Sequence, residues 1–384
     1  QTQLWKAVKT EVARVVDELR VPGLTVTQEF SFQFGFAAKV TAEVLEMILN
    51  HPSVIRVEQD GELKAHLQQG IPLMHADAPR SNGHDGSGVS IAICDTGIDT
   101  SHPRLGGGGN PFNSKVIGGY DTGDNDADPR PNANNGNAHG TACAGIAAGD
   151  LGAVGDYIGG VAPGAKLYAI KISTGTGGSA STSAMIAGWE WAITHQNDDP
   201  ANPIRIISTS FGGGSYAATC DSAVPAMTTA AANAVAAGIT IFASSGNDGY
   251  CGSMGWPACI SSVNSVGAVY DANFGIYTPC VSSSSCAAKL PTTGCTTGWY
   301  VSENTAADKV TAYSNSTSFL TLFAPSNKAY SADIVGSGGY SSGDYYASFG
   351  GTSAACPYAA GAAAVLQSAA KAVTGAYLTP AQVR

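Results

Sequence analysis

Charged side chains are scarce in this chain of 384 residues, since only 12% are Asp, Glu, Lys or Arg and their formal sum is -10. An acidic chain of this kind argues against a nucleic-acid partner, because phosphate binding needs clustered Lys and Arg. Long apolar runs are also missing, and no stretch reaches the ~18 consecutive apolar residues of a membrane span. With 44% hydrophobic residues the chain can still bury a core, which excludes wholesale disorder.

Common metal and cofactor patterns are also absent. No CxxC pair or paired His spacing supports a zinc site. The segment Gly86-Ser87-Gly88 precedes a predicted strand instead of following it, so it is not a dinucleotide-binding loop. The first residue is Gln and no secretory signal follows it, so a signal has either been removed or was never present.

The few charges are unevenly distributed. Residues 1–68 hold 7 basic and 9 acidic residues, whereas residues 69–384 hold 12 and 20. The first segment is therefore more than twice as dense in charge as the rest. This step predicts two domains, residues 1–68 and residues 69–384.

The first segment shows the pattern of a small α+β domain in the order helix, strand, helix, strand. Apolar residues between Trp5 and Leu19 recur at helical spacing, and Phe residues alternate with small polar residues from Phe30 to Phe36. Thr41 is placed to cap a second helix, and Val54 to Glu58 completes the pattern as a strand. We expect four residues of that second helix to face inward: Val44, Leu45, Ile48 and Leu49.

Short apolar runs separated by Ala-rich stretches follow residue 85. This alternation predicts an α/β domain with a doubly wound, mostly parallel sheet. The predicted strands are Val89–Cys94, Lys166–Ile172, Ile204–Ser208, Ile239–Ala243 and Val263–Val269, and the clearest helices are Thr182–His195 and Ser222–Ala237. Thr379 and Pro380 begin a further helix five residues before the end, so we expect the domain to be truncated at its C-terminus.

Three polar residues lie at strand ends or helix starts. Asp95 follows a buried strand, His139 begins a helix of small residues, and Ser353 lies at a helix start where free N–H groups favour an oxyanion. Pro357 is expected in the first turn of that helix, where no amide donor is needed. Taken singly, the three polar residues also fit a turn Asp, a capping His and an N-cap Ser.

Together they are the carboxylate, base and nucleophile of acyl-transfer catalysis, in the order Asp, His, Ser. That order is found in the subtilisin arrangement and not in the α/β-hydrolases. Asp95-Thr96-Gly97, His139-Gly140-Thr141 and Gly351-Thr352-Ser353 match three family motifs, so the chain resembles the subtilisin-like serine proteases. Ala142 and Tyr358 depart from the His often found there in the family, but neither is a triad position.

The resemblance implies a subtilisin-like fold and further site residues. Asn247 would donate to the oxyanion beside the Ser353 backbone N–H, and Gly255 would leave a deep pocket that favours large apolar side chains before the scissile bond. Residues 210–213 resemble a strand that pairs with extended peptide. The implied substrate-binding residues are Ser210, Phe211, Gly212, Gly213, Ser244, Ser245, Gly246 and Gly255.

The resemblance also gives residues 1–68 a role. They look like the family's ferredoxin-like propeptide, which acts as inhibitor and intramolecular chaperone until self-cleavage near residues 64–70. The whole chain would then be a secreted, monomeric zymogen that acts on proteins or peptides and needs no cofactor for catalysis.

Cysteines and aspartates suggest two kinds of structural support. Six Cys in loop-like sequence allow three disulfides in 15 connectivities, with Cys251 to Cys259 as the first choice, while Cys94, Cys143 and Cys356 are expected to be buried. Alternating carboxylates before His139 could bind a structural calcium ion, as related proteases often do in this loop, although the Gly of an EF-hand is missing. These residues are Asp121, Asp124, Asp126 and Asp128.

The leading interpretation is a serine endopeptidase that works through an acyl-enzyme. A catalytically silent pseudoprotease that only binds proteins is the main alternative, although the intact Asp95, His139, Asn247 and Ser353 count against it. An esterase would use the same three groups, but the sequence around Ser353 is not G-x-S-x-G.

Overall fold

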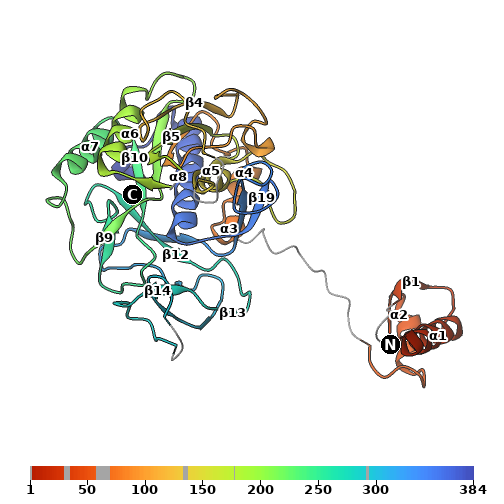
Figure 1. Cartoon of the computed structure of the whole chain (residues 1–384). Coiled ribbons are helices and arrows are strands. Elements are labelled where there is room, and N and C mark those ends of the chain that lie inside the picture. Colours follow the sequence, from red (N-terminus) through yellow and green to blue (C-terminus); the bar gives the residue numbers. More distant parts are fainter. Residues whose placement is uncertain (1, 30–34, 58–69, 133–136, 177, 291–293) are drawn as a thin grey trace. The chain divides into compact units, whose positions relative to one another are not determined.

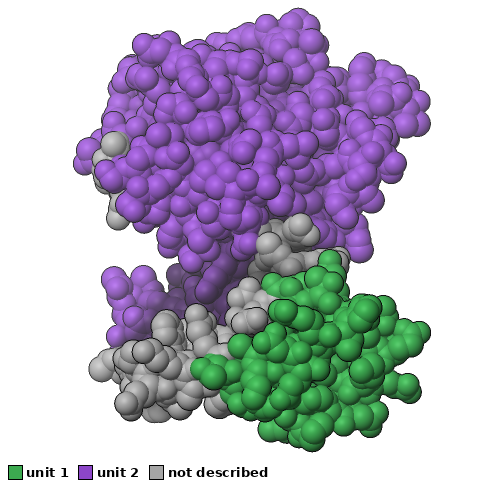
Figure 2. Space-filling view, turned by 90° about the vertical axis from the view of Figure 1, so that its right-hand side faces the viewer, with its two compact units in different colours: residues 1–64 green, residues 65–384 purple. Residues whose placement is uncertain are grey.

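The computed structural model describes all residues except 1, 30–34, 58–69, 133–136, 177 and 291–293. The chain folds into two compact units, residues 1–64 and residues 65–384, which are coloured separately in Figure 2. The expected self-cleavage segment at 64–70 lies almost entirely outside the described residues.

Among its described residues the first unit contains two helices and one antiparallel pair of strands (Figure 1). Its elements are α1 (Thr2–Glu18), β1 (Leu24–Glu29), β2 (Phe36–Val40) and α2 (Ala42–Leu49), and the two strands pair antiparallel. Thr41 caps α2 as expected, because its side chain accepts a hydrogen bond from Val44 N. The strand expected at Val54–Glu58 is wrong for residues 54–57, which join no sheet, and most of the expected Phe30–Phe36 strand lies outside the described residues.

Helix α2 buries only part of its apolar surface. Val44 and Ile48 pack with Leu19 in a small core, but Leu45 and Leu49 are 37% and 57% exposed, so the inward orientation expected for them is wrong. The physical reason lies in the helical period: Leu45 and Leu49 each follow Val44 and Ile48 by one residue, which turns them about 100° away from the stripe that packs in this core. The first unit therefore carries an exposed apolar patch on α2.

The second unit is built on a parallel sheet of seven strands, as the alternating pattern predicted. All five predicted strands are present. The two edge strands, β4 and β17, were missed, because β4 is interrupted by Gly118 and Gly119 and β17 has only four residues. In spatial order the strands are β17 (Leu322–Pro325), β12 (Asn264–Val269), β10 (Thr240–Ser244), β8 (Ile204–Thr209), β3 (Ser90–Asp95), β5 (Lys166–Lys171) and β4 (Val116–Asp121).

Outside this sheet, the described residues of the second unit form five short antiparallel strand pairs. They are β6 (Ser173–Thr174) with β7 (Ser179–Ala180), β9 (Gly213–Tyr216) with β11 (Met254–Trp256), β13 (Ile276–Tyr277) with β16 (Glu303–Asn304), β14 (Cys280–Ser282) with β15 (Gly298–Tyr300), and β18 (Ala329–Ala332) with β19 (Tyr345–Phe349). The helices are α3 (Gly70–Leu73), α4 (Asp77–Ser81), η1 (Pro103–Leu105), α5 (His139–Ala148), α6 (Thr182–Thr194), α7 (Pro225–Ala236), α8 (Thr352–Thr374) and α9 (Pro380–Val383).

Helices cover both faces of the sheet, which explains why its strands are apolar throughout. Alternate residues of β3 point to opposite faces: Ile91 and Ile93 pack with α5 and α8, whereas Ala92 and Cys94 pack on the side of α6 and α7. Figure 1 shows α8 running beside the sheet through the centre of the unit. None of the described helices is long and apolar enough to cross a membrane.

Small residues allow α5 and α8 to approach closely. A Cβ at Gly361 of α8 would lie 2.7 Å from the carbonyl oxygen of Ala147 in α5 and 2.6 Å from Cβ of Val161. Only glycine fits at this contact. The Gly- and Ala-rich composition therefore brings the starts of α5 and α8, which hold His139 and Ser353, to the same region of the molecule.

The six loop cysteines form three disulfides among the described residues. The pairs are Cys220–Cys259, Cys251–Cys286 and Cys280–Cys295, with Cα–Cα distances of 5.3, 6.0 and 5.9 Å. The expected pairing of Cys251 with Cys259 is wrong, because Cys259 lies beside Cys220. The carbonyl oxygen of Cys259 accepts a hydrogen bond from the backbone N–H of Cys220 at 3.0 Å. Cys94, Cys143 and Cys356 are buried and unpaired, as expected.

We expect the Cys220–Cys259 bond to contribute to stability. It closes a loop with a sequence separation of 39 residues. A cross-link over such a loop lowers the conformational entropy of the unfolded chain, which raises the free energy of unfolding by roughly 3–4 kcal/mol. The Cys220→Ala/Cys259→Ala variant should therefore melt several degrees lower than the parent in calorimetry. Cys94→Ala, which removes a buried free thiol, is the matched control, and an equal loss in both variants would contradict the prediction.

Candidate active site

Asp95 lies at the carboxyl end of the sheet, as the last residue of β3. Its side chain is buried, and Oδ1 accepts hydrogen bonds from Nδ1 of His139 at 2.8 Å and from the backbone N of Thr96 at 2.7 Å. The carboxylate is therefore held from two sides. Asp95 and His139, which are 44 residues apart, form the pair that the sequence predicted.

Backbone contacts hold the start of α5 against this strand end. Thr96 Oγ1 donates to the carbonyl of Asn137 at 2.7 Å and accepts from Gly140 N at 2.9 Å. A Cβ at Gly140 would lie 2.4 Å from the carbonyl oxygen of Gly97, so a larger residue would push His139 away. The glycine in the His139-Gly140-Thr141 motif is thus required by close packing.

The imidazole of His139 lies in a partly apolar environment. Its ring makes edge contacts with Phe211 and Phe349 at centroid distances of 5.8 and 5.3 Å, and about one-fifth of the side chain is exposed. Burial lowers the pKa of His139, but the charge and hydrogen bond of Asp95 outweigh it, so the net pKa is raised above the usual value. Asp95 thus both orients the ring and favours its protonated form.

Ser353 is the second residue of α8, whose N-cap is Gly351. Asn247 lies against this start: its Oδ1 accepts from the backbone N of Thr352 at 2.7 Å and from Thr352 Oγ1 at 3.0 Å. With Oδ1 occupied in this way, the Nδ2 of Asn247 is the group left to donate. Asn247 and Ser353 therefore lie in neighbouring segments, as the resemblance implied.

Pro357 has a different role from the one expected. It lies six residues into α8, in the second turn, where it cannot donate to the carbonyl of Ser353 four residues earlier. That carbonyl instead accepts from Ser210 Oγ at 3.1 Å and from Cys143 Sγ at 3.5 Å. The proline thus frees an acceptor on the nucleophile's own backbone, and Ser210 occupies it.

Cys143 lies one helical turn after His139 and was predicted only as a buried residue. Its Sγ is 3.8 Å from His139 Nδ1 and also contacts the carbonyl of Ser353. Burial and the nearby Asp95 carboxylate raise the pKa of the Cys143 thiol well above its ordinary value. The thiol is therefore neutral.

The implied substrate-binding residues lie on three segments, residues 210–213, residues 244–246 and Gly255. Ser210, Phe211 and Gly212 follow β8 without joining any described sheet, and β9 begins only at Gly213, so a continuous strand over 210–213 is not present. Gly213 pairs with Trp256 of β11.

Gly255 lies between the segment 244–246 and Gly213. Its N–H donates to the carbonyl of Ser245, and a Cβ there would lie 3.4 Å from the carbonyl oxygens of Gly213 and Ser245. Ser244 ends β10, and Gly246 N donates to Thr352 Oγ1 at 3.2 Å. The segment 244–246 therefore joins the predicted pocket to the start of α8.

The four aspartates proposed for calcium already have partners. Lys171 Nζ bonds Oδ2 of Asp121, and it donates to Oδ2 of Asp124 at 2.9 Å. These two carboxylates raise the pKa of Lys171 although its burial acts in the opposite direction.

The other two aspartates are engaged as well. Asp128 is paired with Arg130, which lowers the pKa of that carboxyl, and Asp126 Oδ1 accepts from Asp128 N. Lys171 and Arg130 thus offset part of the negative charge that would attract a calcium ion to this loop. The calcium site stays a prediction, and no step below depends on it.

Sequence reasoning missed several residues that complete the site. Thr96 and Thr352 lie inside the motifs that contain Asp95 and Ser353. Their hydroxyl groups, directly next to these two residues in the sequence, could have indicated a role in the site. Phe349 carried no such signal, because its contact with His139 joins chain segments far apart in the sequence. Cys143 lies four residues after His139 on the same helix, and that spacing was its signal.

We expect the pKa of His139 to fall when the charge of Asp95 is removed. In Asp95→Asn, burial would remain while the attraction to the carboxylate would be lost, so the imidazole should lose its proton at a lower pH than in the parent chain. NMR titration of the histidine ring protons measures this, with the six other histidines as internal controls. An unchanged or higher His139 pKa would contradict the electrostatic role of Asp95.

Comparison with known protein families supports this geometry. A model of the subtilase family matches residues 86–384, and a model of the peptidase inhibitor I9 family matches residues 24–66. Subtilisin E of Bacillus subtilis (strain 168) is 34% identical over 269 residues, which is 68% of this chain and 62% of subtilisin E. An alkaline protease of Shouchella clausii is 33% identical over 264 residues, 67% of this chain and 60% of that protease.

A solved structure shows the same fold. It is described as a cold adapted subtilisin-like serine proteinase, and it aligns with a TM-score of 0.52 and 26% identity over 78% of this chain and 80% of its own. The chain spans a little under two thirds of the length of the subtilisins it matches. With a family match over most of its length and this fold, the chain belongs to the subtilase family and carries a peptidase inhibitor I9 segment ahead of its subtilase domain.

Proposed function

We propose that this chain is a serine endopeptidase in which Asp95, His139 and Ser353 form the catalytic triad. The single observation that carries the proposal is the 2.8 Å hydrogen bond between His139 and buried Asp95, formed beside the start of the helix that holds Ser353. A buried carboxylate on Nδ1 leaves the other imidazole nitrogen to act as base. Subtilase family membership supports this assignment.

The reaction would proceed by acyl transfer. His139 accepts the proton of Ser353 Oγ as that oxygen attacks the peptide carbonyl, and the backbone N–H of Ser353 and the Nδ2 of Asn247 donate to the developing oxyanion. His139 then gives the proton to the leaving amine, and water cleaves the acyl-enzyme by the same route. Because Asp95 raises the pKa of His139, activity should rise with pH as the imidazole becomes neutral.

The segments around the triad suggest how substrate would bind. Residues 210–212 belong to no described sheet and can pair with an extended peptide by strand addition. Gly255 is buried between Gly213 and Ser245 and has no side chain to fill the space there. On the resemblance of the segment at Gly255 to the family's specificity pocket, we propose a preference for large apolar side chains before the scissile bond.

The first unit would act as the inhibitory propeptide of a zymogen. Its match to the peptidase inhibitor I9 family and the exposed apolar side chains of α2 support binding to another protein surface, for which its own catalytic unit is the proposed partner. The three disulfides support release into an oxidising environment. We propose secretion as a monomer.

Expression of the zymogen and its Ser353→Ala variant tests this function. The parent should lose about 65 N-terminal residues and then cleave protein substrates, whereas the variant should fold but remain at full length, as measured by intact mass and peptide hydrolysis. Ser284→Ala, in an exposed loop, is the matched control and should behave like the parent. If the folded parent stays intact and does not react with a serine-directed phosphonate, the chain is a binding protein and the proposal fails.

Ser210 should act as a positioning residue for the nucleophile. In Ser210→Ala the carbonyl of Ser353 would keep only the weak thiol donor of Cys143, so kcat should fall roughly tenfold with little change in KM, the effect of about one hydrogen bond. Ser210→Thr, which keeps the hydroxyl, should recover most of the rate. A change in KM alone, or no rescue by Thr, would contradict this role.

A further inference from the structure

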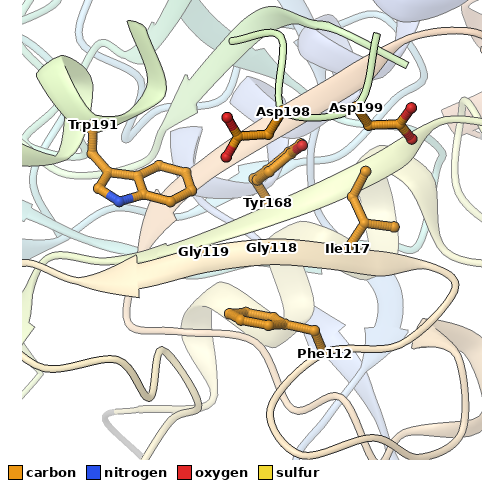
Figure 3. A pocket seen from close by; sticks show the side chains of 8 residues that line it. All are labelled: Phe112, Ile117, Gly118, Gly119, Tyr168, Trp191, Asp198 and Asp199. Carbon is orange, nitrogen blue, oxygen red and sulfur yellow. The ribbon is translucent and has the colours of Figure 1, made fainter. Parts of the chain in front are cut away.

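A cavity of about 470 Å³ lies beside the edge strand β4, outside the site described above (Figure 3). Gly118 and Gly119 of β4 form one wall, and the side chains of Tyr168, Trp191 and Asp198 surround the space. In the sheet register, Asp95 pairs with Lys171 of β5, and Tyr168 lies three residues before Lys171. At ~3.3 Å per residue the cavity is about 10 Å along the strands from the level of Asp95.

Its aromatic wall is held in place by ring contacts. The ring centroids of Tyr168 and Trp191 lie 5.9 Å apart at an interplanar angle of 55°, and Trp191 also stacks on His195 at 3.9 Å and 9°. A Cβ at Gly118 would lie 2.6 Å from the ring of Tyr168, so glycine lets this ring reach the strand. The aromatic surface is thus preformed, and ring faces of this kind attract cations.

The charged wall is acidic. Asp199 accepts hydrogen bonds from Asn202 Nδ2 at 2.8 Å and from Ala201 N at 3.0 Å, which lowers the pKa of Asp199 and keeps it ionised. Asp198 lies beside it in an exposed position (Figure 3). Lys166 is near Asp199, but its Nζ donates to the carbonyl of Ser114, and neither Lys nor Arg is among the described residues that line the cavity.

The strand that borders the cavity has an open edge. Among the described strands β4 pairs only with β5. On its other side, Val116 O accepts from Asn113 N and Asp121 pairs with Asp126, so the middle of the strand, which includes both glycines, is left without a strand partner. An extended chain can add to such an edge by strand pairing. Because residues 118 and 119 are glycines, no side chain at these positions would obstruct it.

We propose that this cavity is an exosite for a Lys or Arg side chain of an extended polypeptide that lies along β4. The ammonium or guanidinium would contact the carboxylate of Asp198, which points toward the rings of Tyr168 and Trp191 (Figure 3), while Asp199 adds negative charge beside it. The peptide backbone would lie beside Gly118 and Gly119. Two carboxylates beside aromatic rings favour a cation over a neutral ligand. A sugar, which also stacks on aromatic rings, is the competing occupant.

Direct binding tests the exosite without any use of peptidase activity. The probes are two blocked peptides, acetyl-Gly-Gly-Lys-Gly-Gly-amide and the same peptide with norleucine in place of Lys, with acetyl-lysine-amide and cellobiose as further arms. They are titrated into the 15N-labelled full chain carrying Ser353→Ala, and the indole signal of Trp191 is followed after its assignment with Trp191→Phe.

The Lys peptide should bind about tenfold more tightly than the norleucine peptide, and also more tightly than acetyl-lysine-amide. Added salt should weaken the binding of the Lys peptide. Asp198→Asn should reduce that affinity several-fold, whereas Asp308→Asn, at an exposed position outside the cavity, should not. Equal affinity for Lys and norleucine peptides, no effect of Asp198→Asn, or a response only to cellobiose would overturn the proposal. Equal affinity for the peptide and acetyl-lysine-amide would overturn its polypeptide part.

Discussion

The buried hydrogen bond between His139 and Asp95 is the interaction on which the arrangement of the site depends. A carboxylate with little exposure to water is costly unless its charge is compensated. Here the end of β3 and the start of α5 supply the donors, and glycine at 140 lets the two segments come close enough. The same bond sets the orientation and the pKa of the imidazole, so the local fold and the proposed chemistry have one origin.

The low charge and the abundance of Gly and Ala have a structural explanation. A sheet covered on both faces cannot tolerate many charges, and a long central helix such as α8 needs small residues where it meets α5. Lys171 is buried as part of a paired group with Asp121 and Asp124. The same pairing offsets part of the negative charge of the aspartate loop.

Patterns that depend on neighbouring residues were predicted well. The five buried strands, the two main helices, the cap at Thr41 and the three motifs around Asp95, His139 and Ser353 all follow from local periodicity or short spacing. Predictions failed where the deciding contact came from elsewhere. The glycines of edge strand β4 interrupted its apolar pattern, Leu45 was expected to be buried but is 37% exposed, and Cys251 was assigned the wrong partner.

The sequence by itself determined the α/β class, the order of the three catalytic candidates and the charge step between two parts of the chain, because these are encoded in residue types at short or ordered spacing. Only the tertiary structure decided which cysteines meet, that Lys171 lies among the aspartates, and that Ser210 occupies the carbonyl that Pro357 leaves free. Each of these joins residues far apart in the chain, and such contacts are set by how helices and strands pack and not by any local pattern.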